Sequence, residues 1–227
     1  MSFDIVNIDK YCGGKVGSCG KHGQFLPDHV RAIICGPSNS GKTNLMLNLI
    51  FNKNGLKFEN IYIFSKSLYQ DKYRFLESVI SEVPEIGFYA YSDNDELPHP
   101  SDLQPNSVMI FDDVSCEKQS NIKSYFTMGR HNKVDTFYLC QTYSSVPKQL
   151  VRDNANFLVL FRQDGMNLRH VYHDHVDPDM TLCQFTNVCN RVWNCRNNSF
   201  LVIDKEKDID CGRYRHGIDV DKLICIK

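Results

Sequence analysis

The fold of this chain is decided by one stretch, Gly36-Pro37-Ser38-Asn39-Ser40-Gly41-Lys42-Thr43. The stretch matches the phosphate-binding pattern G-x-x-x-x-G-K-[ST] at every position. An apolar run over Ala32–Cys35 leads into it, and a helical pattern over Lys42–Asn52 follows it. A strand, this loop and a helix in that order aim backbone N–H groups and the positive end of the helix at phosphate oxygens. We therefore expect residues 36–43 to bind a nucleotide.

Two side chains of this phosphate loop are expected to carry its chemistry. Lys42 is placed to neutralise the β- and γ-phosphates, and the Thr43 hydroxyl is placed to ligate Mg²⁺. The glycines Gly36 and Gly41 permit backbone conformations in which successive N–H groups point inward. A chance match within a strand–helix turn is the alternative, and the flanking strand and helix argue against it.

A pair of acidic residues follows a second apolar strand. The segment Ser107–Phe111 is predicted to be buried, and Asp112 and Asp113 come directly after it. Ligands of open α/β sheets bind at the carboxyl ends of the strands. We expect Asp112 to hold Mg²⁺, directly or through water, and Asp113 to polarise the water that attacks the γ-phosphate. A merely solvated acidic loop is the alternative, which the preceding phosphate loop disfavours.

An amide side chain ends a third predicted strand, Thr136–Gln141. A glutamine beside the Mg²⁺ site can hydrogen-bond the γ-phosphate or its attacking water, and can thereby respond to the presence of phosphate. We expect Gln141 to act as this sensor. The alternative is a glutamine that caps a loop.

Short apolar strands alternate with helical patterns along the rest of the chain. This alternation predicts an α/β fold with a mostly parallel sheet flanked by helices on both faces. Residues 28–205 are expected to form this domain, after an irregular lead-in over residues 1–27 and before a polar tail over residues 206–227. Residues 92–106 are expected to form an exposed loop. The predicted strands are Arg31–Cys35, Asn60–Phe64, Phe88–Tyr91, Ser107–Phe111, Thr136–Gln141, Phe157–Phe161 and Ser199–Ile203, and the predicted helices are Lys42–Asn52, Tyr69–Glu82, Lys118–Met128, Pro147–Arg152 and Asp177–Asn190.

Composition excludes several classes of protein. The 227 residues are 42% hydrophobic and 11% aromatic, with a formal net charge of −1, which does not fit a disordered chain. The longest apolar run, Phe157–Phe161, is far shorter than the roughly 20 residues of a membrane span, so no span is expected. Secretion is not expected either, because the first residues lack a basic and then apolar signal pattern. The near-neutral charge confines any nucleic-acid surface to a local patch.

Ten cysteines are expected to be reduced in a cytosolic or nuclear setting. Those in predicted strands, Cys35 and Cys140, should behave as small buried hydrophobes. Two groups have residue types that bind zinc, but neither contains a C-x2–4-C knuckle, so free thiols are favoured. These groups are Cys12, Cys19 and His22, and the evenly spaced Cys183, Cys189 and Cys195.

A GTPase or a small-molecule kinase is the alternative kind of phosphate-loop enzyme. The segment Asn132–Asp135 matches the N-K-x-D string that reads guanine, but it precedes a predicted strand instead of ending one. The glycine of a D-x-x-G motif is also missing, because Asp112 is followed by Asp113, Val114 and Ser115. The match to the guanine-reading string is therefore interpreted as accidental. Small-molecule kinases rarely carry paired acids after the strand that ends before Asp112.

The series of motifs resembles a known family. It comprises the phosphate loop, then Ile110–Asp113, then Gly129-Arg130-His131 before the strand that ends in Gln141, and then Ser145–Ala155 with its Pro-Lys and Arg-x-Asn elements. This order, over about residues 28 to 205, is similar to that of the genome-packaging ATPases of poxviruses, other large DNA viruses, virophages and Maverick-type elements. These enzymes are members of the FtsK–HerA superfamily of DNA-pumping motors.

The resemblance implies a ring ATPase of the additional-strand type that threads double-stranded DNA into a preformed capsid using ATP and Mg²⁺. It assigns Lys42 and Thr43 to phosphate and Mg²⁺, Asp112 to Mg²⁺, Asp113 to water activation and Gln141 to sensing. It also implies an arginine finger that reaches the neighbour's nucleotide, with Arg152 slightly preferred to Arg130; surface salt bridges are the alternative for both. The implied partners are duplex DNA bound without sequence preference, further copies of this chain, and capsid or portal proteins, at sites of virion assembly in the host cytoplasm or nucleus.

Contact with DNA needs basic side chains near the axis of such a ring. Candidates are Lys118, Lys123 and Lys133, between the acidic strand and the sensor strand. The tail cluster Arg213–His216 is a second candidate for contact with DNA, a portal or a capsid protein, although a solvated surface is the commoner role for such a cluster. A small-substrate enzyme and a nucleotide switch that binds a capsid protein remain the alternatives to a motor.

Overall fold

The computed structural model describes residues 21–23, 26–114, 119–218 and 224. A single sheet of eight strands organises them, in the order β3-β2-β4-β5-β1-β6-β7-β8. The strands are β1 (Arg31–Cys35), β2 (Asn60–Ser65), β3 (Gly87–Tyr91), β4 (Ser107–Asp112), β5 (Val134–Cys140), β6 (Phe157–Leu160), β7 (Leu201–Asp204) and β8 (Tyr214–His216).

Strand direction decides where a ligand can bind. The strands β1 to β6 are mutually parallel, whereas β7 is antiparallel to β6 and β8 is antiparallel to β7. The strand β5 lies between β1 and β4, as the additional-strand arrangement requires. Its register pairs Cys140 with Cys35 and Leu139 with Asp112. The carboxyl ends of β1, β4 and β5 therefore meet at one edge, and the expected phosphate-loop NTPase fold is confirmed.

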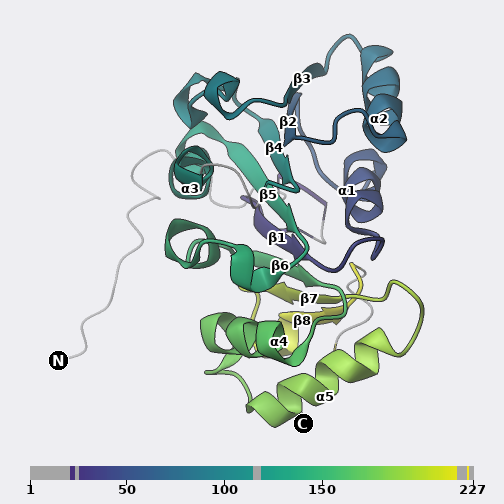
Figure 1. Cartoon of the computed structure of the whole chain (residues 1–227), viewed down its shortest axis with the longest axis vertical. Coiled ribbons are helices and arrows are strands. Elements are labelled where there is room, and N and C mark those ends of the chain that lie inside the picture. The colour runs from purple at the N-terminus through teal and green to yellow at the C-terminus, as the bar shows by residue number, and fades with distance from the viewer. Residues whose placement is uncertain (1–20, 24–25, 115–118, 219–223, 225–227) are drawn as a thin grey trace, which may run out of the picture.

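Helices cover both faces of the sheet (Figure 1). Apolar side chains of α1 and α2, such as Leu49 and Leu76, pack on one face, and those of α3, α4 and α5, such as Ile122, Val171 and Phe185, pack on the other. None of the helices in the described ranges has the length and apolar character that crossing a membrane requires. The helices are α1 (Lys42–Phe51), α2 (Asp71–Ser81), α3 (Gln119–Met128), α4 (Gly165–Val171) and α5 (Leu182–Trp193).

Some helical segments differ from the expectation. The helix expected to begin at Asp177 begins at Leu182, because Thr181 and Gln184 form a reciprocal capping box at that point. The residues before it form α4, which was not predicted, and a π-helical turn, η7 (Tyr172–Val176). The segment expected to be a helix up to Arg152 is a second π-helical turn, η6 (Lys148–Arg152).

The segment 92–106 is less exposed than expected. It forms the 3-10 turns η2 (Asn94–Glu96) and η3 (Pro100–Asp102), and it buries Leu97 and Leu103 in the core. These two leucines anchor the segment by removing apolar surface from water. The remaining 3-10 turns are η4 (Gly129–Asn132), η5 (Tyr143–Ser145) and η8 (Ile209–Cys211).

Two residues of the tail cluster Arg213–His216, Tyr214 and Arg215, are buried and so are not part of a surface for DNA or capsid contact. Residues 214–216 are the strand β8, which extends the sheet beside β7. Arg215 is 1% exposed, because its guanidinium faces the buried Asp204 carboxylate at 3.4 Å and the Phe157 ring at 5.8 Å. Tyr214 is also buried. A buried, neutralised arginine is a structural feature of this edge of the sheet.

Candidate nucleotide-hydrolysis site

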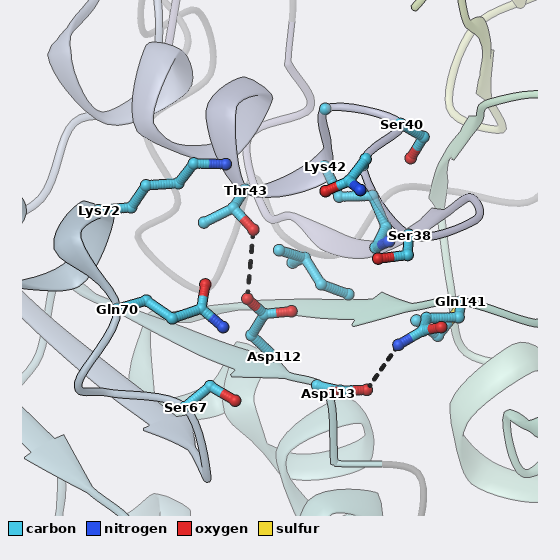
Figure 2. A pocket seen from close by; sticks show the side chains of 14 residues that line it. Ser38, Ser40, Lys42, Thr43, Ser67, Gln70, Lys72, Asp112, Asp113 and Gln141 are labelled. Atoms are coloured by element: carbon cyan, nitrogen blue, oxygen red, sulfur yellow. Dashed lines mark hydrogen bonds between the residues drawn. The ribbon is translucent and has the colours of Figure 1, made fainter.

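A hollow of about 190 Å³ lies where the carboxyl ends of β1, β4 and β5 meet (Figure 2). Most of the residues predicted for the site line it. They come from the phosphate loop, from the end of β4 and from the end of β5, and a further wall comes from the segment that leads into α2. The lining includes Ser38, Asn39, Ser40, Gly41, Lys42, Thr43, Ser67, Gln70, Lys72, Asp112, Asp113 and Gln141.

The phosphate loop has the conformation that the two glycines were expected to permit. Gly41 has φ 103°, in the left-handed region. Gly36 is buried, and a Cβ there would lie 2.6 Å from the Phe161 Cβ, so no larger residue fits. The Lys42 ammonium donates to the carbonyl oxygens of Gly36 at 2.7 Å and Pro37 at 3.0 Å. The loop thus holds a cation at its own mouth, where phosphate oxygens are expected.

Thr43 and Asp112 form an oxygen-rich pair that fits Mg²⁺. The Thr43 hydroxyl donates to the Asp112 Oδ2 at 3.4 Å (Figure 2). Hydroxyl and carboxylate oxygens are the ligands that this hard cation prefers. Burial raises the pKa of Asp112, while the Tyr73 hydroxyl and the Lys42 charge oppose that rise. A nearly buried carboxylate whose Oδ2 accepts from two hydroxyls favours a cation for its remaining oxygen.

A tyrosine that was not predicted also supports Asp112. The Tyr73 hydroxyl, on the first turn of α2, donates to the Asp112 Oδ2. Burial and the nearby Asp112 charge raise the pKa of Tyr73, so its proton stays in place as the donor. In the sequence Tyr73 falls on the apolar stripe of a helix together with Leu76 and Ile80, and therefore appears as an ordinary core residue.

Replacing Tyr73 by phenylalanine is expected to weaken the use of Mg²⁺ without abolishing nucleotide binding. The variant keeps the ring in the core and removes only the hydroxyl that orients Asp112. Because a hydrogen bond to a charged group is worth about 1.5–3 kcal/mol, we expect the Mg²⁺ concentration for half-maximal ATP turnover to rise roughly tenfold. ATP binding measured in EDTA should not change. An unchanged Mg²⁺ requirement would show that Tyr73 only fills the core.

The residues directly after β4 and β5, Asp113 and Gln141, contact each other in the hollow. The Gln141 amide donates to the Asp113 Oδ1 at 3.3 Å (Figure 2). Asp113 is exposed and has φ 56°, a left-handed conformation that turns the chain directly after β4. An aspartate tolerates this region better than a β-branched residue. Asp113 and Gln141 therefore face the space in front of the phosphate loop, where a water molecule can reach both.

The wall opposite the phosphate loop is formed by Ser67, Gln70 and Lys72, which sequence reasoning missed. Lys72 is exposed, and Figure 2 shows its side chain beside that of Thr43. The sheet order places β2 next to β4, so the segment after β2 borders the site. The only available signal was a lysine near the start of a predicted helix, which is not specific to any chemistry.

The two arginines expected as fingers lie outside the hollow. Arg152 is buried, with its Nη1 2.7 Å from the Asp174 Oδ2 and its guanidinium 5.1 Å from the Tyr143 ring centroid. Arg130 is exposed in η4, which precedes β5 and so lies at the opposite edge of the sheet from Gln141.

The guanine-reading alternative does not fit the structure. Asp135, its last residue, is 1% exposed and accepts hydrogen bonds from Val30 N, Lys21 and His22. Burial alone would raise the pKa of Asp135, but the hydrogen bonds and charges of His22 and Lys21 outweigh it and lower the pKa. Asp135 therefore supports the start of β5, away from the hollow.

The two groups of residues that were considered as zinc ligands do not form a zinc site among the residues that the structure describes. Both ring nitrogens of His22 are engaged, Nε2 with Asp135 and Nδ1 with the Lys57 N–H, while Cys12 and Cys19 lie outside the described residues. Cys189 is buried on α5, and Cys183 and Cys195 are exposed. Over the ranges that the structure describes, no three His, Cys, Asp or Glu side chains gather as a metal site. Cys35 and Cys140 are buried in the sheet, as expected.

Of the lysines considered for DNA contact, two can be placed. Lys123 is half-buried on α3, and Lys133 is exposed between η4 and β5 with φ 56°. Lys123 and Lys133 both lie on segments that precede β5, and Arg130 does too. The third candidate, Lys118, lies outside the described residues.

No family model matches the sequence, and a comparison with curated proteins finds no match. Solved structures are similar in fold. The genome packaging NTPase B204 of Sulfolobus turreted icosahedral virus 2, solved with sulfate, has a TM-score of 0.54 and 16% identity, over 78% of this chain and 92% of its own. The same protein with ATP-gammaS gives 0.53 and 15%, over 79% and 94%. The DNA-packaging ATPase B204 of Sulfolobus turreted icosahedral virus gives 0.52 and 14%, over 77% and 92%. The chain thus shares the fold of viral genome-packaging NTPases.

Proposed function

We propose that this chain is an ATPase that drives double-stranded DNA into a preformed viral capsid. The observation that carries the hydrolytic part is the gathering of Lys42, Asp113 and Gln141 around one hollow at the ends of adjacent strands. The likeness in fold to proteins described as genome-packaging NTPases supports the packaging part. Its partners would be duplex DNA bound without sequence preference, further copies of this chain in a ring, and capsid or portal proteins.

Five residues of the hollow have a task in the proposed reaction. Lys42 exchanges the loop carbonyls for oxygens of the β- and γ-phosphates, and Thr43 and Asp112 are the residues that would hold Mg²⁺. When bound, Mg²⁺ neutralises phosphate charge. Asp113 accepts a proton from water as the water oxygen bonds to the γ-phosphorus and the bond to ADP breaks. The Gln141 amide orients that water.

The arginine finger is proposed to come from a neighbouring subunit. Arg130 is exposed and lies at the edge of the sheet opposite its own phosphate loop, so it is free to meet another subunit's nucleotide. Arg152 would first have to leave its ion pair with Asp174, and breaking a buried pair costs about 3–5 kcal/mol. These observations favour Arg130, although the resemblance slightly preferred Arg152.

Arg130→Ala is expected to keep ATP binding and to lose turnover by about 10³-fold, the effect of removing such a finger. Mixing it with Asp113→Asn subunits should restore part of the activity, because an Arg130→Ala site keeps its own Asp113 and receives Arg130 from a neighbouring Asp113→Asn subunit. Arg152→Ala is mixed with Asp113→Asn subunits in the same way, and the restored activities of the two mixtures are compared. Rescue with Arg152→Ala and none with Arg130→Ala would reverse the assignment.

Steady-state ATP hydrolysis tests the proposed function. The purified chain is assayed with and without long duplex DNA, at low salt and at several protein concentrations. A DNA motor that works as a ring should turn over faster per subunit as the protein concentration rises, and faster again with DNA. Turnover that responds to neither would contradict the proposal and favour an enzyme of small substrates. ATP binding without turnover would favour a nucleotide switch.

A further inference from the structure

A second lysine lines the hollow, on the wall that faces the phosphate loop. Lys72 is the second residue of α2, and its side chain reaches along the hollow with its ammonium end pointing toward Thr43 (Figure 2). Lys42 enters the same hollow from the phosphate loop. Of the residues that the structure describes, Lys42 and Lys72 are the cationic ones that line this hollow. Two cations on opposite walls bracket the space in which phosphate oxygens are expected.

The backbone at Lys72 is fixed relative to the end of β4. The next residue, Tyr73, is buried, and its hydroxyl donates to the Asp112 carboxylate. Before the helix, the Gln70 N–H donates to the Ser67 carbonyl at 3.1 Å and closes the turn that leads into α2. The Lys72 side chain therefore starts from a fixed point at the rim of the hollow.

The ammonium of Lys72 is not used to hold the protein together. Lys72 is exposed, and its Nζ makes no hydrogen bond or ion pair with any residue that the structure describes. The adjacent Asp71 is exposed and does not line the hollow, and adjacent residues of a helix do not face each other. A cation in the first turn is also disfavoured by the positive end of the helix dipole. The stability of α2 therefore does not account for a lysine at this position.

The order of the strands decides which part of a bound triphosphate Lys72 can meet. The phosphate loop follows β1 and Asp113 follows β4, with β5 between these two strands. The segment from β2 to α2 lies beyond β4, on the side away from β1. A triphosphate that runs from the phosphate loop toward Asp113 presents its terminal phosphate to that side. Its other phosphates stay over the loop, away from Lys72.

We propose that Lys72 binds the terminal phosphate of ATP from the wall opposite Lys42, and that it thereby makes the site distinguish ATP from ADP. This inference rests on the proposed nucleotide-binding function and names a further residue for it. Lys42 has a phosphate partner in both nucleotides, because ADP keeps the β-phosphate. Lys72 has a partner only while the γ-phosphate is present. An ammonium with three donors on a flexible stem suits such a contact, because it can follow a phosphate oxygen.

The test compares two ligands that differ only at the terminal phosphate. Binding of ADP and of a non-hydrolysable ATP analogue, each with Mg²⁺, is measured by calorimetry. Lys72→Met removes the charge and keeps a flexible, unbranched side chain, whereas Lys72→Arg keeps a cation. Arg74→Met is the matched control, because Arg74 is an exposed cation of the same helix that does not line the hollow.

Lys72→Met should weaken binding of the ATP analogue about tenfold, the loss of one charge-assisted hydrogen bond, and should leave ADP binding within about twofold of wild type. Lys72→Arg should retain most of the affinity for the analogue, and Arg74→Met should bind both ligands like the wild type. Unchanged binding of the analogue by Lys72→Met would overturn the inference, and so would an equal loss for ADP. If the wild type binds neither ligand, the proposed nucleotide-binding function itself fails.

Discussion

Lys42→Ala is expected to abolish measurable ATP binding, with a loss of affinity of about a hundredfold or more. The Lys42 ammonium is the cation that the phosphate loop itself holds, through the carbonyls of Gly36 and Pro37. An ammonium that engages two phosphates supplies more than one charge-assisted hydrogen bond, and each is worth about 1.5–3 kcal/mol. Equilibrium binding of ATP and of tripolyphosphate measures the effect, and both ligands should be affected alike.

The control for this variant is Lys53→Ala. Lys53 is an exposed lysine just beyond α1 that does not line the hollow. Removing the Lys42 side chain should cost little folding stability, because its hydrogen bonds are made to carbonyls of its own loop and join no other element to it. Thermal unfolding should therefore be similar for both variants. ATP affinity retained in Lys42→Ala would contradict the assignment of residues 36–43 as a phosphate loop.

Asp113→Asn is expected to separate binding from hydrolysis. The amide has the shape of the carboxylate but cannot accept a proton from water, and general-base catalysis typically contributes 10²–10⁴-fold. ATP turnover should fall by about that factor while ATP affinity stays within a few-fold of wild type. Single-turnover measurements with excess protein isolate the chemical step from product release.

Asp112→Asn provides the comparison for Asp113→Asn. It changes the neighbouring carboxylate, which is buried and lies beside Thr43, so its defect should be relieved by raising the Mg²⁺ concentration. The defect of Asp113→Asn should not be relieved in this way. Turnover by Asp113→Asn within a few-fold of wild type would show that another group activates the water.

Much of the hollow could be predicted from the sequence because parallel strands bring their carboxyl ends together. Asp112, Asp113 and Gln141 each follow or end a short apolar run, and Thr43 ends the phosphate-loop motif that follows another. These patterns alone predict that the four residues share one edge of a sheet. The structure brings these residues together, with Thr43 next to Asp112 and Asp113 next to Gln141. Local pattern and long-range geometry agree at this site.

The residues that could not be predicted depend on contacts between segments far apart in sequence. The sequence pattern of Tyr73 is that of a core residue, and only the packing of α2 against the end of β4 brings its hydroxyl to Asp112. The sequence around Arg215 is that of a charged surface segment, and only the pairing of β8 with β7 places Arg215 against Asp204. Arg152 is buried in an ion pair with Asp174 on η7, and no periodic pattern in the sequence predicted that turn.

The most direct test of the proposed motor is movement along DNA. A linear duplex carrying a short third strand as a triplex is incubated with the wild-type protein and ATP, and release of the third strand is followed over time. We predict release that requires ATP and Mg²⁺, with no release by Asp113→Asn at the same protein concentration. ATP hydrolysis in the presence of the duplex without release of the third strand would contradict the account.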